Sequence, residues 1–161
     1  MIALAEPANS PSRRAPLLWA ASALLWWIVP VVVQVWWVLV HPPPARLHVT
    51  VAAVTVALMA VHIGVVPVWR YRVHRWEISD QAAFTRTGWL VQEHRIAPIS
   101  RVQTVDTYRG PLDRLFNLAN VTVVTASSAG AVRIVALDSD VAERVVAQLT
   151  DIAALGASDA T

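Results

Sequence analysis

Two long hydrophobic runs fill the first half of the chain, one from Leu17 to Val40 and one from Leu47 to Trp69. Neither run contains an Asp, Glu, Lys or Arg residue. At about 1.5 Å per residue, each would form a helix of roughly 35 Å, which is long enough to cross a hydrocarbon core of about 30 Å. Three consecutive prolines at positions 42–44 separate the runs. The pattern therefore predicts a transmembrane helical hairpin over residues 17–69, with its helices at 17–40 and 47–69.

The hydrophobic pattern changes after Trp69, where short alternating runs rich in Val, Ile, Thr and aromatic residues replace the long apolar segments. Turn-forming residues interrupt these runs at intervals of about eight to twelve residues, which is typical of an antiparallel sandwich or a small barrel. We expect strands at residues 71–78, 82–87, 89–96, 101–108, 121–126 and 131–135.

A helical period returns after Asp138, where apolar residues recur at Val141, Val145, Leu149 and Ile152. Asp140, with Glu143 three residues later, is suited to cap the start of a helix. We expect an amphipathic helix that runs to about Ala154 and covers one open end or face of the sheet. Residues 70–155 then form one small domain, with a disordered cytoplasmic tail at 1–16 and a second tail at 156–161.

The charges around the hairpin predict its orientation. Arg13 and Arg14 precede the first helix and three Arg residues follow the second, whereas the connecting loop holds Arg46 alone. Positive residues keep short flanking segments in the cytoplasm. We therefore expect a multi-pass protein of a bacterial plasma membrane with both termini in the cytoplasm. An uncleaved helix is favoured over a signal peptide, because the first run is much longer than the hydrophobic region of a typical signal peptide and no clean small-residue cleavage site follows it.

Composition excludes several functions. The chain has no cysteine, so disulfides, thiolate nucleophiles and Cys-based metal sites are excluded. From residue 70 onward, ten Arg residues balance ten acidic residues, which argues against a nucleic-acid partner because nucleic-acid binding needs a clustered basic surface.

No group of residues resembles an active site. His94 lies between Glu93 and Arg95, but neighbours in a strand point to opposite faces, so the pair Glu93 and Arg95 is expected to be solvated and His94 to lie opposite it. In the membrane, Gln34 and His62 are expected at different depths, and we expect a neutral His62 satisfied by the backbone or by a partner helix. We expect no catalytic, cofactor-binding or metal-binding residues, and no cofactor.

The segment from Arg109 to Ala119, between two expected strands, has the most distinctive sequence in the domain. Gly110 and Pro111 turn the chain, and apolar residues spaced by three and four predict a short helical turn. This turn could plug the barrel mouth or dock a partner, and the candidate docking residues are Arg109, Leu112 and Arg114. Phe116 is expected in the core, and Asp106 and Asp113 are expected to form surface ion pairs with Arg109 and Arg114.

The order of these motifs resembles a known family. The hairpin is followed by Tyr71-Arg72-Val73, then by residues 95–105, 110–119 and 123–126, an order similar to that in bacterial pleckstrin-homology-like (PH-like) proteins once grouped as a domain of unknown function. Asn117 stands where this family more often has Gly, and Arg109 where it often has Gln. The resemblance covers about residues 10–155. It implies an α+β protein in which a membrane hairpin carries a small, partly open β-sandwich closed by a C-terminal helix, with no established catalytic residues.

Two functions remain open from the sequence. The first is a non-catalytic scaffold that holds a membrane or cytoplasmic protein at the inner face of the membrane, with another PH-like protein or a second copy of this chain as options. The second is recognition of anionic membrane lipid by the candidate headgroup residues Arg70, Arg72 and Arg75, with Arg86 or Arg95 as further options. The simpler explanation of the three juxtamembrane arginines is that they only set the orientation of the hairpin in the membrane.

Overall fold

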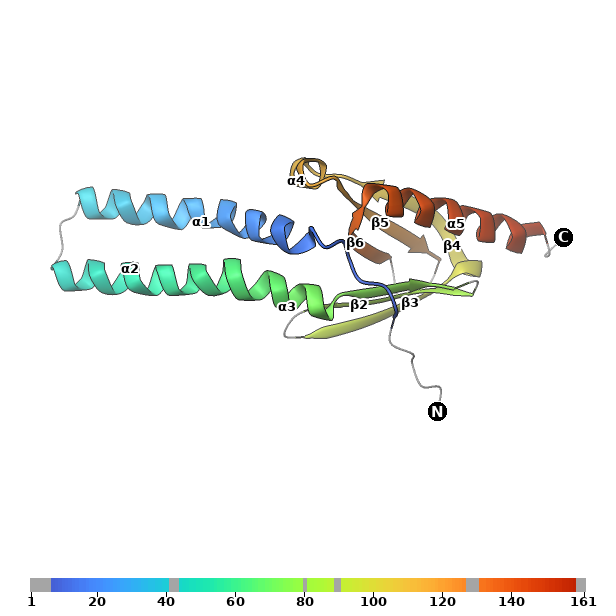
Figure 1. The fold of residues 1–161 in the computed structure, drawn as a ribbon, viewed down its shortest axis with the longest axis horizontal. Coiled ribbons are helices and arrows are strands. Elements are labelled where there is room, and N and C mark those ends of the chain that lie inside the picture. The colour runs from blue at the N-terminus through green and yellow to red at the C-terminus, as the bar shows by residue number, and fades with distance from the viewer. Residues whose placement is uncertain (1–6, 41–43, 80, 89–90, 127–130, 159–161) are drawn as a thin grey trace.

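The computed structural model describes residues 7–40, 44–79, 81–88, 91–126 and 131–158. Two long helices lie side by side as a hairpin, and a smaller domain of two sheets and a helix sits at one end of it (Figure 1). The predicted α+β architecture, with an open arrangement of antiparallel sheets and a C-terminal helix, is confirmed.

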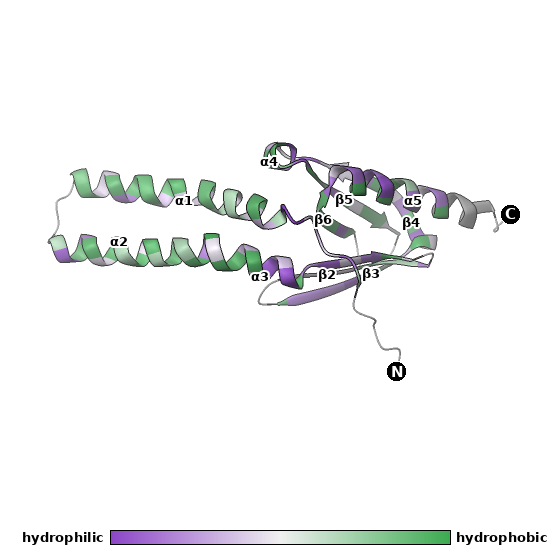
Figure 2. Cartoon of the chain, viewed as in Figure 1, coloured by the Kyte–Doolittle hydropathy of each residue, from purple (hydrophilic) through white to green (hydrophobic). Residues whose placement is uncertain are grey.

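The hairpin consists of α1 (Ala15–Val40) and a second, longer helix built from α2 (Ala45–Ala60), the π-helical turn η1 (Val61–Val65) and α3 (Val66–Val73). The spans Ala15–Val40 and Ala45–Val73, of 26 and 29 residues, are both long and apolar enough to cross a membrane. Hydrophobic residues cover both helices almost from end to end, whereas polar residues gather at α3 and in the domain (Figure 2).

The π-helical turn η1 ends at Val65, two residues before Pro67 in the second helix. A proline in a regular α-helix lacks the N–H that bonds to the carbonyl four residues earlier, and its ring clashes with that carbonyl. The wider turn of a π-helix gives the ring room, so the helix continues past Pro67 to Val73.

The domain contains two three-stranded antiparallel sheets. The first sheet has the order β1 (Arg75–Ile78), β2 (Ala82–Gly88) and β3 (Gln92–Pro98). The second has the order β4 (Val102–Tyr108), β5 (Leu118–Thr125) and β6 (Val132–Asp138). The 3-10 turn η2 (Ile99–Arg101) joins the sheets, the short helix α4 (Pro111–Leu115) joins β4 to β5, and the C-terminal helix is α5 (Ser139–Ser158).

The main core lies between the second sheet and α5. Val121, Val123 and Ile134 on the strands meet Val145 and Leu149 on the helix, and all five side chains are buried. Two side chains of the first sheet, Trp76 and Ile78, pack against the same cluster. The expectation that the final helix covers the sheet is therefore confirmed.

Several element boundaries differ from those expected from sequence. The predicted strand at 71–78 begins only at Arg75, because the second membrane helix continues to Val73. The predicted strand at 121–126 begins at Leu118, so residues 118 and 119 belong to β5 and not to a helical turn. The strand expected at 89–96 is observed from Gln92 to Pro98, with residues 89 and 90 outside the described ranges.

Residues 9–12 form a strap that joins both sheets before α1 begins. The backbone N–H and C=O of Asn9 bond to the C=O and N–H of Trp76 in β1, at 3.0 and 2.9 Å. Three residues later, the Ser12 N–H donates to the carbonyl of Ala136 in β6 at 2.9 Å. Part of the segment expected as a disordered tail at 1–16 therefore lies against the domain.

Candidate functional site

The end of α3, where the membrane hairpin meets the domain, is capped by side chains. The last carbonyl groups of a helix have no partner within the helix. Here the guanidinium of Arg75 donates to the carbonyls of Tyr71 and His74, at 3.4 and 3.1 Å. Arg86 on β2 donates from Nε to the carbonyl of Val73 at 3.1 Å. Arg75, a predicted lipid-headgroup residue, therefore lies at the helix end and bonds to backbone.

Arg70 turns from α3 toward the first membrane helix. Its guanidinium carbon lies 4.5 Å from the centre of the Trp19 ring, a cation–π arrangement. The ring of Trp19 also lies 5.2 Å from the imidazole of His74. Arg72, the third predicted lipid-headgroup residue, is exposed. The three arginines thus have three different surroundings.

His74 is buried at the junction and is held in its neutral form. Its Nδ1–H donates to the carbonyl of Arg70 at 2.8 Å, because a carbonyl can only accept. Burial, and to a lesser extent the positive charge of Arg70, lower the pKa of His74 to about 4, against an opposing effect of the hydrogen bond to the Arg70 carbonyl. His74 is 4% exposed and directly follows the last residue of α3.

A cavity of about 550 Å³ adjoins Arg70. Its walls come from α3, β2, β3 and β6, and its polar lining includes Thr85, Thr87, Arg95 and Arg133. From the sequence, Arg95 was expected only as an option, and Thr85, Thr87 and Arg133 were not expected at a site. The pairing of β2 with β3 could have revealed some of these lining residues, because Thr85 lies opposite Arg95 and Thr87 lies opposite Glu93. These polar pairs continue the strand face on which Ala83 and Ala97 are buried.

The α4 turn holds the predicted docking residues in different environments. Arg114 is exposed, whereas Leu112 packs under α1 against the cluster that contains Leu18 and Trp19. Arg109 bonds from Nε to the carbonyl of Leu118 at 3.1 Å, so it braces the start of β5. Arg114 is therefore the docking candidate that is freely presented, and Arg109 and Leu112 support the turn.

The predicted ion pairs around this turn are absent among the described residues. Asp113 is buried, and its Oδ2 accepts from the backbone N–H of Gly110 at 2.8 Å and from Nδ2 of Asn120 at 3.1 Å. The carboxylate thus caps the N-terminus of α4, because the free N–H groups there need an acceptor. The ion-pair interpretation was wrong for Asp113 because spacing in the sequence does not distinguish a cap from a surface pair.

The residues that follow α4 explain one departure from the family pattern. Asn117 adopts a φ of 55°, in the left-handed region where Gly is favoured and Asn is tolerated. Phe116 is half-buried and packs against the cluster of Leu18, Trp19 and Leu118, so its predicted core role is confirmed.

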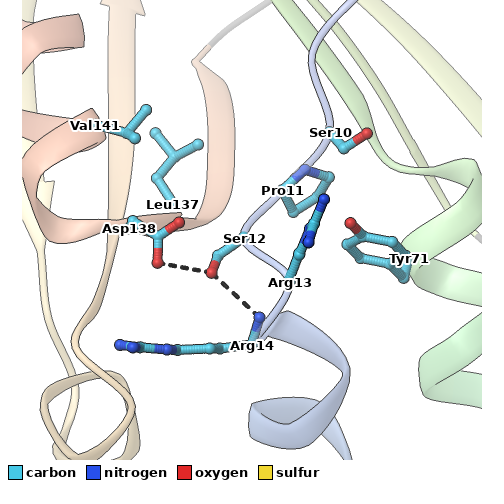
Figure 3. Close-up of a pocket in the computed structure, with 9 residues that line it drawn as sticks. All are labelled: Ser10, Pro11, Ser12, Arg13, Arg14, Tyr71, Leu137, Asp138 and Val141. Carbon is cyan, nitrogen blue, oxygen red and sulfur yellow. Dashed lines mark hydrogen bonds between the residues drawn. The ribbon is translucent and has the colours of Figure 1, made fainter.

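A second cavity of about 500 Å³ lies beside the strap (Figure 3). Ser12 stands between the start of α1 and the end of β6, and its Oγ donates to Asp138 Oδ1 at 2.7 Å. The same oxygen accepts from the N–H of Arg14 at 3.2 Å, which caps α1. These bonds make Ser12 a structural link between hairpin and domain.

Among the described residues, the remaining histidines do not form a metal site. His94 is exposed, while Glu93 and Arg95 on the other face form an ion pair of 2.7 Å, as predicted. His62 in η1 accepts a hydrogen bond at 3.1 Å from Trp27 Nε1 on α1, which confirms that a neighbouring helix satisfies it. His41 lies outside the described ranges. Within those ranges, no group of three or more His, Cys, Asp or Glu residues could hold a metal ion.

Comparison with known proteins identifies the family. A model described as "Bacterial PH domain" matches residues 15–153, which include the hairpin as well as the sheets. The chain belongs to the bacterial PH domain family. The resemblance predicted from the sequence motifs is thereby confirmed.

One relative of this chain is a membrane protein by name. The UPF0699 transmembrane protein YdbS of Bacillus subtilis (strain 168) is 41% identical to this chain over 78 residues. The match covers 48% of this chain and 45% of YdbS, so the chain spans less than half of that relative. No solved structure matches the chain. Together with the two apolar helices, the relative indicates that this bacterial PH-like protein is a membrane protein.

Proposed function

We propose that this protein is a non-catalytic, membrane-anchored binding module whose PH-like domain holds a partner protein at the cytoplasmic face of the membrane. The observation that carries the proposal is the exposed surface at α4. Arg114, Leu115 and Tyr108 are exposed there, and the side chains of Leu115 and Tyr108 keep 75% and 65% of their surface in solvent. Tyr and Arg are enriched among the residues that dominate protein interfaces.

The anchoring of this surface supports a scaffold role. Leu112 packs beneath it against the first turns of α1, and Asp113 and Arg109 hold the turn from both sides. The exposed side chains therefore stand on a turn that is fixed to the membrane hairpin. A surface whose position is fixed loses little conformational entropy when a partner binds.

The proposed orientation has both helices crossing the membrane and both termini in the cytoplasm. Both ends of the hairpin that carry Arg13, Arg14, Arg70, Arg72 and Arg75 lie on the side of the domain, and the end with Arg46 lies opposite (Figure 1). Single-cysteine labelling tests this directly, because the native chain has no cysteine. Pro44→Cys should react with an impermeant maleimide on intact cells, and Asp151→Cys only after permeabilisation. The reverse pattern would contradict the orientation.

The partner role is tested by affinity purification of the full-length protein in mild detergent, followed by quantitative mass spectrometry. We expect one protein in near-stoichiometric amount with the wild type, and its loss with Arg114→Glu. Arg101→Glu is the matched control, because Arg101 is also exposed but lies at η2 between the sheets. A photo-crosslinker placed at Leu115 should link to the same protein. Equal recovery with Arg114→Glu and the wild type would contradict docking at α4.

A further inference from the structure

The cavity beside Arg70 presents donors that have no acceptor. Within the described residues, the guanidinium groups of Arg70 and Arg133 donate no hydrogen bond, and the hydroxyls of Thr85 and Thr87 have no partner. Arg70 is half-buried and Thr85 is buried, so these groups have lost much of their contact with water. Polar groups that line a cavity and have no protein partner are available to hydrogen-bond a polar ligand.

The charge in this cavity is positive, although the domain as a whole is neutral. Glu93 is the acidic residue among its lining residues, and it pairs with Arg95 at 2.7 Å. Arg70 and Arg133 remain as uncompensated charges. Guanidinium groups bind phosphate oxygens through paired N–H donors, and threonine hydroxyls add further donors. A cavity of about 550 Å³ also falls within the usual size of a small-ligand site.

An adjoining groove leads from this cavity along the membrane hairpin. The groove, of about 440 Å³, shares Arg70 and Val135 with the cavity and continues past Leu18, Ala23 and Trp26 of α1. Its domain side carries Asp113 and Asn120, whose polar atoms bond to each other. Ala23 and Trp26 belong to the apolar run that is long enough to cross a membrane, and 78% of the Trp26 surface is exposed.

We propose that Arg70, Arg133 and the two threonines bind the phosphate headgroup of an anionic phospholipid, with an acyl chain in the groove beside Trp26. A basic cavity joined to a groove that has polar residues on its domain side and runs along the apolar helix α1 complements a molecule with a charged head and a hydrocarbon tail. The site differs from a general attraction of exposed arginines to the membrane, because Arg72 lies outside it. It also does not depend on the partner-binding role of α4.

Position identifies the lipid as the source of the phosphate. The second helix is about 44 Å long and exceeds a hydrocarbon core of about 30 Å, so Arg70 near its end lies at headgroup level. A soluble phosphorylated compound would gain the same contacts with Arg70 and Arg133 and none with Trp26. The two sources are therefore distinguished by whether the acyl chain contributes to binding.

The test is a lipid titration of the full-length protein in detergent, followed by native mass spectrometry. Dioleoylphosphatidylglycerol and dioleoylphosphatidylcholine have the same tails, and glycerol phosphate supplies the headgroup without tails. We expect one molecule of the anionic lipid per protein, in clear preference to the choline lipid, and no retention of glycerol phosphate. Arg133→Gln should weaken binding roughly tenfold, the size expected for the loss of one charge-assisted hydrogen bond.

Arg72→Gln is the matched control, because it removes an exposed arginine two positions from Arg70 without altering the cavity. We expect it to leave the affinity within about twofold of the wild type. Arg133 is exposed, so its replacement tests the site even if Arg70→Gln does not fold. Equal losses for Arg72→Gln and Arg133→Gln would overturn the proposal, as would equal retention of the two lipids. Retention of glycerol phosphate with no gain from the lipid tails would overturn the lipid source.

Discussion

Trp27 on α1 donates a hydrogen bond of 3.1 Å from its indole N–H to Nδ1 of His62, which lies in the π-helical turn of the second membrane helix. The two rings also meet edge to face, with centroids 6.3 Å apart. A donor and an acceptor that would each be unpaired in hydrocarbon thus satisfy one another across the hairpin.

Replacing Trp27 should weaken the contact between the two helices. Trp27→Phe keeps an aromatic ring and removes the donor, and we expect the free energy of unfolding to fall by about 1 kcal/mol. Trp26→Phe is the control, because Trp26 is its neighbour and is 78% exposed. Thermal unfolding in detergent measures both changes. An equal loss from Trp26→Phe would indicate that ring size, and not the bond to His62, matters.

Ser12 should be the most sensitive residue of the strap. Ser12→Ala removes both the bond to Asp138 and the cap of α1, so the free energy of unfolding should fall by about 1 to 2 kcal/mol. Ser10→Ala provides the comparison, since Ser10 is exposed and contributes its backbone carbonyl to Trp76. The same unfolding measurement applies. If both variants match the wild type, the strap is not fastened through Ser12.

The backbone at Asn117 sets a preference among substitutions. Because its φ is 55°, Asn117→Gly should keep the stability of the wild type, whereas Asn117→Ala should lower the free energy of unfolding by about 1 kcal/mol. Asn117 is exposed, so loss of buried contacts does not complicate the comparison. Its Oδ1 accepts from Arg109 at 3.3 Å, and both variants lose that bond equally. An alanine variant as stable as the glycine variant would show that the turn can relax.

Stability should decline as the pH falls below neutral because of His74. Its pKa is about 4 in the fold and about 6.5 when unfolded, so between these values the unfolded chain binds the extra proton. The stabilisation that comes from keeping His74 neutral is fully present above pH 6.5 and is lost progressively toward pH 4. Between pH 7.5 and pH 5 it amounts to about 2 kcal/mol.

Two substitutions distinguish the effect of His74 on the pH dependence of stability from the effect of other titrating groups. His74→Asn should remove this part of the pH dependence, while its amide can still donate to the carbonyl of Arg70. His94→Asn replaces an exposed histidine on β3 and should titrate like the wild type. Melting temperatures measured from pH 5 to pH 7.5 give the comparison. A His74→Asn protein with the pH profile of the wild type would contradict a buried neutral imidazole.

The sequence was most informative where a repeating pattern extends over many residues. The hairpin follows from two uncharged runs, and α5 from helical spacing after Asp138, because burial on one face or in lipid imposes a period on the residues. The end of α3 was missed because Tyr71 to Ile78 also alternates like a strand. There the capping bonds of Arg75 and Arg86 to helix carbonyls favour the longer helix.

Features that depend on distant contacts could not be predicted. The strap has only a few polar residues and no period, and its partners Trp76 and Ala136 lie far along the chain. The cavity likewise joins Arg70 and Arg133 from elements that are separate in sequence. The capping role of Asp113 was missed for a different reason, since an acid near an arginine fits a surface pair as well as a cap.

The strap also dictates an order of events during synthesis. Ser12 leaves the ribosome early, but its partner Asp138 is made 126 residues later, after both apolar helices and five strands. The hairpin can therefore enter the membrane before the sheet that fastens it exists. Closure of the strap at Ser12 is therefore a late step of assembly, and a nascent chain interrupted before β6 would be inserted in the bilayer but not yet joined to its domain through Ser12.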